Sequence, residues 1–497
     1  MKHNVPFLAA SVLVVAPLAA AQSRRALAPE DVYRLKVVSD PQLSPDGQWV
    51  AYVVTSIDDA KNKRVANIWM VPADGSRDAR PFIDDVPARS PRWSSDGKWL
   101  AFLSNGQARE KPREAFAEKS PAPEAAARNQ VWLVARDGSN RRVITHFANG
   151  VSRFSWSPDG AQLAVVTRLA SKSSDVRHYA SMMYKRDEGG WSDGSHNHIW
   201  VVNINDGDAR QLTNGADSDD SDPQWSPNGQ WISYLSSQAS ADLREVNGIE
   251  AILVIPSHGG ESRTICDRRM YVGSPAWSPD SKQLAYAAAP SAADQPLLWV
   301  APVADPPKAT LASDTDLFPL EVKWDATGLW FGAHERGASP LYRVDLATRR
   351  AIKVIGGERA VHELRTSDAA HRLVYLENDD AHPHNVFSSD LDGRQERQLT
   401  FQNREPLAQL QLAPSERLSW KSADGLAIEG FFKRPVGWQP GRKYPMILAI
   451  HGGPNGMFGF HWEIDEQLYA AQGLCRVADQ PARLLWLRHQ LSEGGGQ

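Results

Sequence analysis

The feature that most constrains the fold is an internal repeat built around a Ser-Pro-Asp-Gly turn. Five clear copies begin at Leu43, Trp93, Trp156, Trp225 and Trp277, and two weaker copies begin at Trp324 and Thr366. In most copies an aromatic residue ends one strand, Pro-Asp-Gly supplies a tight turn, and an alternating apolar run starts the next strand. The chain therefore predicts a β-hairpin that recurs at a period of roughly 40–70 residues.

A second alternating segment follows each hairpin, as in Ile68-Trp-Met-Val and Val131-Trp-Leu-Val, and most are followed by a turn and a short polar strand. Such a four-stranded unit cannot bury an apolar face alone. Units packed radially cover one another and leave few free edges. We expect a mostly β fold with a seven-bladed β-propeller over residues 41–405; a β-sandwich is the alternative. A propeller by itself fits a binding scaffold as well as an enzyme.

Two insertions and an acidic cluster interrupt the repeat. Residues 105–128, rich in Ala, Glu, Lys and Pro, predict an exposed loop or short helix. Residues 170–198 are rich in aromatic side chains, which fits either the lining of an opening or packing between blades. The acidic cluster is interpreted as a solvated loop rather than a calcium site. Its members are Asp217, Asp219, Asp220 and Asp222. No metal site or cofactor is predicted.

Residues 1–21 have the layout of a cleavable secretory signal: a basic start, an apolar run from Val5 to Leu18 and a final Ala-Ala-Ala. The apolar run is shorter than the ~20 residues of a membrane-spanning helix. We expect a secreted or periplasmic protein with no membrane span after cleavage, in which residues 22–40 lead into the propeller.

The composition argues against a nucleic-acid partner and against a disulfide-rich fold. The chain has 55 basic and 59 acidic residues, a net charge of -4, and thus no basic excess for phosphates. Nucleic acid is not an expected partner. Cys266 and Cys475 are the only cysteines, so no disulfide framework is expected.

The pattern changes beyond residue 404. Residues 416–435 predict an Asp-Gly hairpin outside the blade period, and residues 444–450 form a continuous apolar run typical of a strand buried on both faces of a mostly parallel sheet. The run leads into His-Gly-Gly-Pro at residues 451–454. Glycines there let backbone N–H groups approach a developing oxyanion. Gly452 and Gly453 are therefore oxyanion-region candidates; a simple tight turn is the alternative.

In this order, the signal peptide, the Ser-Pro-Asp-Gly repeats, the Asp-Gly hairpin, the apolar strand and His-Gly-Gly-Pro resemble the prolyl oligopeptidase family. The likeness is greatest to its secreted acylaminoacyl-peptidase and dipeptidyl-peptidase-like branch, and it runs from about Pro29 to Leu474. The resemblance implies that residues 406–474 begin an α/β-hydrolase domain. It also implies serine peptidase chemistry on short peptides, with the propeller screening what reaches the active site.

A serine peptidase needs a serine on a Gly-x-Ser-x-Gly turn, a histidine and an acid. No Gly-x-Ser-x-Gly follows His451, and His489 is the only histidine after His461. The rest of the domain would need on the order of 200 residues. We expect no catalytic triad, an incomplete hydrolase domain and an inactive chain. A non-catalytic, TolB-like periplasmic propeller that binds proteins is the alternative, and a pseudoenzyme kept for its propeller is a third.

Residues 475–497 lack strand or helix start signals suited to a hydrolase sheet. Codons for residues 475–488 can be chosen so that reading one nucleotide later gives Ala-Val-Leu-Leu-Thr-Asn-Pro-Arg-Gly-Ser-Ser-Gly-Tyr-Gly. That string resembles the family's next strand and loop. The hypothesis is a one-nucleotide insertion near Cys475 that leaves residues 475–497 as an aberrant tail.

Overall fold

The computed structural model describes residues 24–106, 128–169, 185–186, 190–191, 194–215, 218–237, 249–270, 273–289, 294–313, 315, 317–452 and 457–480. Four segments lie wholly or mostly outside these ranges: the expected signal peptide, the insertion at 105–128, the insertion at 170–198, and residues 481–497. Among the described residues no helix is long and apolar enough to cross a membrane.

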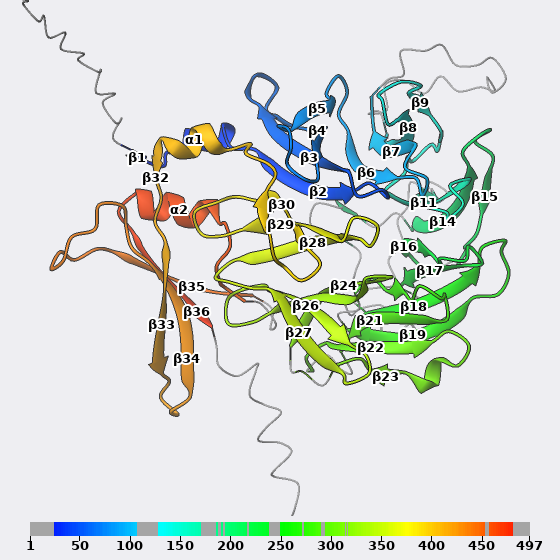
Figure 1. Cartoon of the computed structure of the whole chain (residues 1–497). Coiled ribbons are helices and arrows are strands. Elements are labelled where there is room, and N and C mark those ends of the chain that lie inside the picture. Colours follow the sequence, from blue (N-terminus) through cyan, green and yellow to red (C-terminus); the bar gives the residue numbers. More distant parts are fainter. Residues whose placement is uncertain are drawn as a thin grey trace, which may run out of the picture.

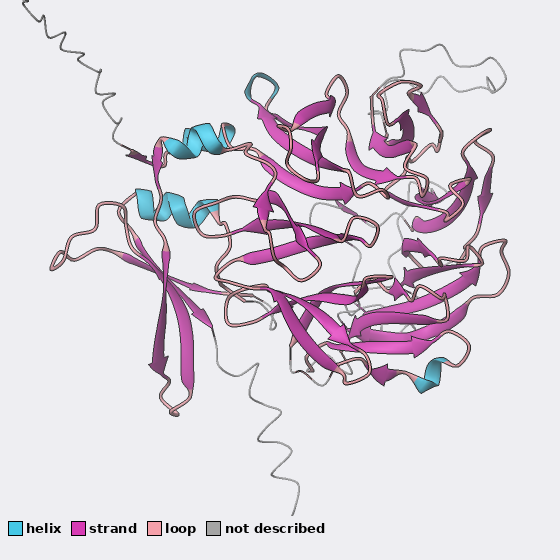
Figure 2. Ribbon diagram, viewed as in Figure 1, coloured by secondary structure: helices cyan, strands magenta, loops and turns pink. Residues whose placement is uncertain are grey.

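Figures 1 and 2 show that β-strands dominate the described chain, which contains seven consecutive four-stranded antiparallel sheets. The first three sheets consist of β2 (Val37–Leu43), β3 (Trp49–Asp58), β4 (Lys63–Pro72) and β5 (Arg80–Ile83); β6 (Arg89–Trp93), β7 (Trp99–Ser104), β8 (Gln130–Ala135) and β9 (Arg142–Val143); and β10 (Arg153–Trp156), β11 (Gln162–Leu169), β14 (His196–Asn203) and β15 (Ala209–Gln211). The fourth and fifth consist of β16 (Asp220–Trp225), β17 (Trp231–Ser236), β18 (Ile249–Pro256) and β19 (Arg263–Met270); and β20 (Ala276–Trp277), β21 (Gln283–Ala288), β22 (Leu297–Pro302) and β23 (Thr310–Leu311). The sixth and seventh consist of β24 (Phe318–Asp325), β25 (Gly328–His334), β26 (Leu341–Asp345) and β27 (Arg350–Ile355); and β28 (Ala360–Ser367), β29 (Arg372–Asn378), β30 (Asn385–Asp390) and β31 (Arg397–Gln398).

The repeated turn joins the first two strands of each sheet, as predicted. In the first copy Trp49 N–H donates to Ser44 Oγ at 2.9 Å, and Gln48 N–H donates to Asp46 Oδ1 at 3.1 Å. Gly47 has a φ of 68°, which a residue with a Cβ rarely adopts. The turn is held by its own side chains, which explains why the sequence signals it locally.

Apolar clusters join each sheet to the next. One cluster, for example, combines Phe102 of β7 with Ile68 of β4. Another combines Tyr52 of β3 with Val374 of β29, so the seventh sheet packs against the first and the array closes into a β-propeller. Every sheet is built from its own stretch of chain, so side-chain packing closes the ring without strand exchange.

The acidic cluster is not a solvated loop where the structure describes it. Asp220 begins β16, is 1% exposed, and accepts a 2.6 Å hydrogen bond from Ser236 Oγ. Asp222 Oδ1 lies 3.5 Å from Arg153 Nη1 of the preceding sheet. The interpretation is wrong for these two carboxylates because neighbouring strands supply donors that the local sequence does not contain. Asp217 lies outside the described residues.

An eighth sheet follows the array, and Figure 1 draws it in orange and red beside the yellow strands. Its strands are β33 (Ser415–Lys421), β34 (Ala427–Lys433), β35 (Met446–Ile450) and β36 (Cys475–Gln480), in the order β33-β34-β36-β35. Helix α2 (Ile464–Ala471) connects β35 to β36, and these two strands are parallel. The hairpin β33–β34 confirms the one predicted within residues 416–435. We refer to this unit as the hydrolase-type sheet.

The lead-in and the linker also meet. Strand β1 (Arg25–Ala26) pairs in parallel with β32 (Leu410–Gln411), which follows the short helix α1 (Arg404–Ala408). The two ends of the propeller are therefore tied together before the hydrolase-type sheet begins.

Residues 475–480 form a strand of the hydrolase-type sheet although their sequence carries no start signal suited to one. Strand β36 lies between β34 and β35 and pairs with both. Ala478 is fully buried within it. The strand forms because both sides find backbone partners far away in sequence, which local start signals do not report.

The prediction that the apolar run is buried on both faces is also wrong. Met446, Leu448 and Ile450 are 60%, 56% and 71% exposed. Strand β35 is the outermost strand of the sheet, and α2 contacts side chains of the opposite face, namely Lys433 and Arg476. Nothing in the described part of the chain therefore buries these three side chains.

Candidate functional site

The predicted oxyanion region lies at the carboxyl end of β35. Gly452 is exposed, and a Cβ added there would meet no atom within 4 Å. His451 Nδ1 lies 2.9 Å from the Gly452 carbonyl oxygen, and the His451 ring packs edge-on against Phe458 at 5.7 Å. Gly453 lies outside the described residues. One candidate thus follows β35, at the end of a strand, where α/β-hydrolases use backbone N–H groups.

The loop of residues 457–463, between the glycines and α2, packs on the hydrolase-type sheet through aromatic rings. Phe460 and Phe431 meet edge-to-face at 5.1 Å, and both form a small core with Ala478. The Arg476 guanidinium lies 4.8 Å from the Phe458 ring centroid, a cation–π contact. These contacts fix the chain that follows the oxyanion region. We call residues 457–463 the anchor loop.

The anchor loop also binds the propeller through its backbone. Phe460 N–H donates to the Gly337 carbonyl oxygen at 2.7 Å, and Trp462 N–H donates to Asn378 Oδ1 at 2.7 Å. A Cβ on Gly459 would come 1.8 Å from the Gly337 oxygen. Two backbones thus meet more closely than side chains would permit, and the hydrolase-type sheet is held in a defined position.

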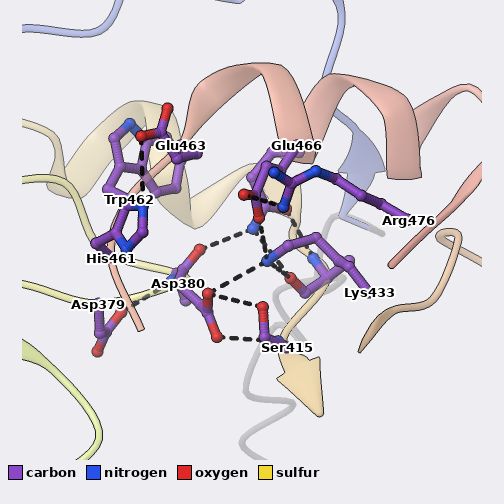
Figure 3. Close-up of polar contacts among 12 residues, drawn as sticks. Asp379, Asp380, Ser415, Lys433, His461, Trp462, Glu463, Glu466 and Arg476 are labelled. Carbon is purple, nitrogen blue, oxygen red and sulfur yellow. Dashed lines mark hydrogen bonds and ion pairs between the residues drawn. The ribbon is translucent and has the colours of Figure 1, made fainter. Parts of the chain in front are cut away.

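A buried ionic network lies beside this contact (Figure 3). Lys433 is 2% exposed, and its Nζ donates to the Ala413 carbonyl oxygen at 2.9 Å and to Asp380 Oδ1 at 3.4 Å. Glu466 Oε2 lies 3.7 Å from the same Nζ, and Arg476 pairs with the other Glu466 oxygen. Burial raises the pKa of Glu466, and the two cations oppose that shift. A buried charge of this kind is tolerated only when it is paired.

Asp380 belongs to the loop between β29 and β30 and receives donors from the hydrolase-type sheet. Ser415 donates through its N–H and its Oγ, both at 2.9 Å. Gln467 Nε2 donates to the Asp380 carbonyl oxygen at 2.7 Å and to the Ala413 carbonyl oxygen at 2.9 Å. The network therefore joins the seventh sheet to β33, β34 and α2. No sequence motif indicated these residues, because their partners come together only in the folded chain.

The described residues of this region do not bring together a nucleophile, a base and an acid. Ser339 Oγ lies 3.4 Å from His334 Nδ1, but Ser339 is 3% exposed, and no carboxylate contacts His334 within the described ranges. A hydroxyl nucleophile needs access to substrate and a base oriented by an acid. The pair is therefore a packing contact, and the absence of a triad from the chain stays a prediction.

Sequence comparison finds relatives over nearly the whole chain. No family model matches it. An uncharacterized peptidase of Bacillus subtilis, YuxL, is 24% identical over 503 residues, covering 92% of this chain and 71% of the relative. Dipeptidyl-peptidase 5 of Porphyromonas gingivalis is 24% identical over 520 residues, covering 96% of this chain and 71% of the relative.

Solved structures agree with the fold. An acylaminoacyl peptidase of Pyrococcus horikoshii superposes with a TM-score of 0.72 at 20% identity, covering 90% of this chain and 65% of that one. The β-propeller domain of the trilobed protease of Pyrococcus furiosus gives a TM-score of 0.52 at 17% identity, covering 74% of this chain and 99% of that domain. This chain thus spans about two thirds of the length of the acylaminoacyl peptidase. The sequence relatives and the shared fold support the predicted resemblance to peptidases of the prolyl oligopeptidase family.

Proposed function

We propose that this chain comprises a seven-bladed propeller and, over residues 406–474, the opening strands of the catalytic domain of a secreted serine peptidase that acts on short peptides. The observation that carries the proposal is the alignment with two peptidases over 92% and 96% of the chain, which extends beyond the propeller into the hydrolase-type sheet. That this chain acts on peptides is inferred only from its similarity to these relatives.

The blade count rests on packing as well as topology. Seven four-stranded sheets occur in order, and apolar clusters link each one to its neighbour. The cluster that joins the first and seventh sheets leaves no gap in that series. A ring of seven like units encloses an axial passage, which fits the screening role that the family resemblance implies.

The parallel pair β35–β36 supports the peptidase proposal over a TolB-like binding propeller. Parallel strands joined by a helix are the unit from which α/β-hydrolase sheets are built. A propeller that only binds proteins has no need of this unit, or of a glycine pair at the end of its strand.

We further propose that the 497 residues alone do not hydrolyse peptides, because no Gly-x-Ser-x-Gly follows His451. The test is to treat the purified chain with a fluorophosphonate probe and with dipeptidyl and N-acylaminoacyl nitroanilides. An active dipeptidyl-peptidase serves as the positive control. We expect no labelling and no turnover. Labelling of a serine in this chain would contradict the proposal.

The peptidase assignment itself is tested by the gene. Sequencing across the codon of Leu474 should reveal, in another frame, a downstream segment that encodes Gly-x-Ser-x-Gly. The chain produced from the corrected frame should cleave short peptides, and replacing that serine with alanine should abolish cleavage. A corrected chain that folds and cleaves no peptide would argue against the assignment.

Export is tested separately, by N-terminal sequencing of the periplasmic or secreted product, which should start at Gln22.

A further inference from the structure

Four histidines come together where the anchor loop meets the propeller. His334 ends β25, His362 lies in β28, His384 precedes β30, and His461 belongs to the anchor loop. The rings of His362 and His384 are 5.9 Å apart, and His461 interacts electrostatically with each of the other three. We call these four residues the histidine cluster. None of its side chains is fully exposed.

The cluster is not arranged to hold a metal ion. Within the described ranges no three His, Cys, Asp or Glu side chains form a group suited to one. His334 instead packs against the Phe318 ring at 5.6 Å and approaches Ser339, and His362 packs against His384. The imidazoles therefore serve as packing groups of the interface, and their charge state affects its stability.

Few negative charges face the cluster. Glu463 Oε1 lies 3.4 Å from His461 Nε2, and Glu463 is the one carboxylate that acts on His384. The nearby carboxylates have other cations: Asp379 pairs with His382 at 2.9 Å, and Glu377 pairs with Arg359 at 2.5 Å. Glu463 also interacts with Arg476. Glu466 also interacts with His461 but is paired with Lys433 and Arg476. These carboxylates, which are shared with other cations, cannot balance several imidazolium ions.

Burial and the charge of neighbouring histidines lower the pKa of His334, His362 and His384. Burial, followed by the charge of His461, lowers the pKa of His334 to about 4. Burial, followed by the charge of His384, lowers the pKa of His362 to about 4, and burial also lowers that of His384. When the anchor loop leaves the propeller, His334, His362 and His384 lose the neighbouring charge of His461 and part of their cover, so their pKa values rise towards the ordinary value near 6.5. The released form thus binds more protons, so docking is fully favoured above pH ~6.5 and weakens as the pH falls towards 4.

We propose that the histidine cluster makes the junction between the propeller and the hydrolase-type sheet acid-sensitive, so that mildly acidic solution releases the anchor loop from the propeller. The proposal concerns the junction and does not depend on peptidase activity. At pH 5, each histidine whose pKa is lowered to about 4 favours release by at most about thirtyfold, the limit reached if its pKa returns fully to 6.5. Two such histidines act together, which makes the transition steep.

Hydrogen–deuterium exchange on the full chain tests this. Peptides that cover Phe460 and Trp462 report the two amides that bind Gly337 and Asn378. After correction for the intrinsic pH dependence of exchange, we expect their exchange to rise at least about tenfold from pH 7.5 to pH 5. Peptides from the strands of the second sheet, which lie away from the histidines, should change little.

Matched variants identify the cause. Combined His334→Gln and His362→Gln substitutions keep polar side chains that do not titrate, and they should remove most of the acid-induced rise. His258→Gln, in an exposed turn, should behave like the unchanged chain. Glu463→Gln removes the shared counter-charge at a half-exposed position and should shift the transition to higher pH. An unchanged rise in the double variant would assign the effect to a carboxylate whose pKa is lowered in the docked form, such as Glu463 or Asp379, and overturn the proposal, as would a flat response of the unchanged chain.

Discussion

At the scale of single residues, the repeated turn depends on one buried hydroxyl in each of the five clear copies. In the second sheet Ser94 is 1% exposed; its Oγ accepts the Trp99 N–H at 3.0 Å and donates to Asp96 Oδ1 at 2.7 Å. The fifth copy shows how much the geometry tolerates. There Ser281 replaces the usual glycine at a φ of 62°, and its Oγ accepts the Asn228 N–H of the preceding sheet at 3.0 Å. The turns thus stabilise hairpins and also connect neighbouring sheets.

Ser94→Ala should therefore destabilise the propeller, because it leaves the part-buried Trp99 N–H without its acceptor and removes one of the donors to Asp96. We expect a loss of about 1–2 kcal/mol in the free energy of unfolding. Ser95→Ala is the matched control, since Ser95 is the next residue and is exposed; its effect should stay within about 0.5 kcal/mol. Urea denaturation followed by circular dichroism compares the two. Equal losses would show that the Ser94 hydroxyl has no special role.

At the scale of secondary-structure elements, local signals and long-range pairing had different predictive value. The hairpins were predictable because Ser44, Asp46 and Gly47 form their turn with one another. Strand β36 was not predictable, since it exists through its pairing with β34 and β35, and its residues carry no start signal. The solvated-loop interpretation of Asp220 failed for the same reason: Ser236, on another strand, supplies its donor.

Strand β35 is the element whose surroundings differ most from the sequence-based prediction. It is the last strand of its sheet and exposes Leu448 between Met446 and Ile450. An exposed apolar edge strand offers unpaired backbone groups to other chains and promotes aggregation. We expect the purified chain to associate as its concentration rises, by edge pairing of β35.

Leu448→Lys should reduce that association, because a charged side chain on an edge strand opposes pairing with another strand. Leu346→Lys is the control: Leu346 is 45% exposed but follows β26, in a propeller turn. Static light scattering at increasing concentration should show a lower apparent mass for the Leu448 variant alone. If both lysine variants reduce scattering equally, general charge repulsion rather than the β35 edge is responsible.

At the scale of the whole molecule, the propeller and the hydrolase-type sheet form one unit through three kinds of contact. These are the backbone hydrogen bonds of the anchor loop, the ionic network around Lys433, and the histidine cluster. In agreement with the comparisons, the sequence predicted both parts, their order and a likeness to peptidases. It did not predict how the parts join, because Gly337, Asp380 and Lys433 occur in unremarkable local sequences and acquire their roles only when the seventh sheet meets α2.

Gly337 provides the sharpest test of that junction. Its φ is 81°, and an added Cβ would come 2.1 Å from Phe431 Cζ, in the core shared with Phe460. Gly337→Ala must therefore displace the Phe431 ring and with it the anchor loop. Gly437→Ala separates this clash from backbone strain, since Gly437 has a φ of 74° and nothing within 4 Å of its Cβ position. We expect about 1 kcal/mol of destabilisation from strain in both variants. Only Gly337→Ala should also speed proteolysis in residues 435–463 while the propeller stays folded by circular dichroism. Equal proteolysis of the two variants would mean that close packing at Gly337 does not hold the hydrolase-type sheet on the propeller.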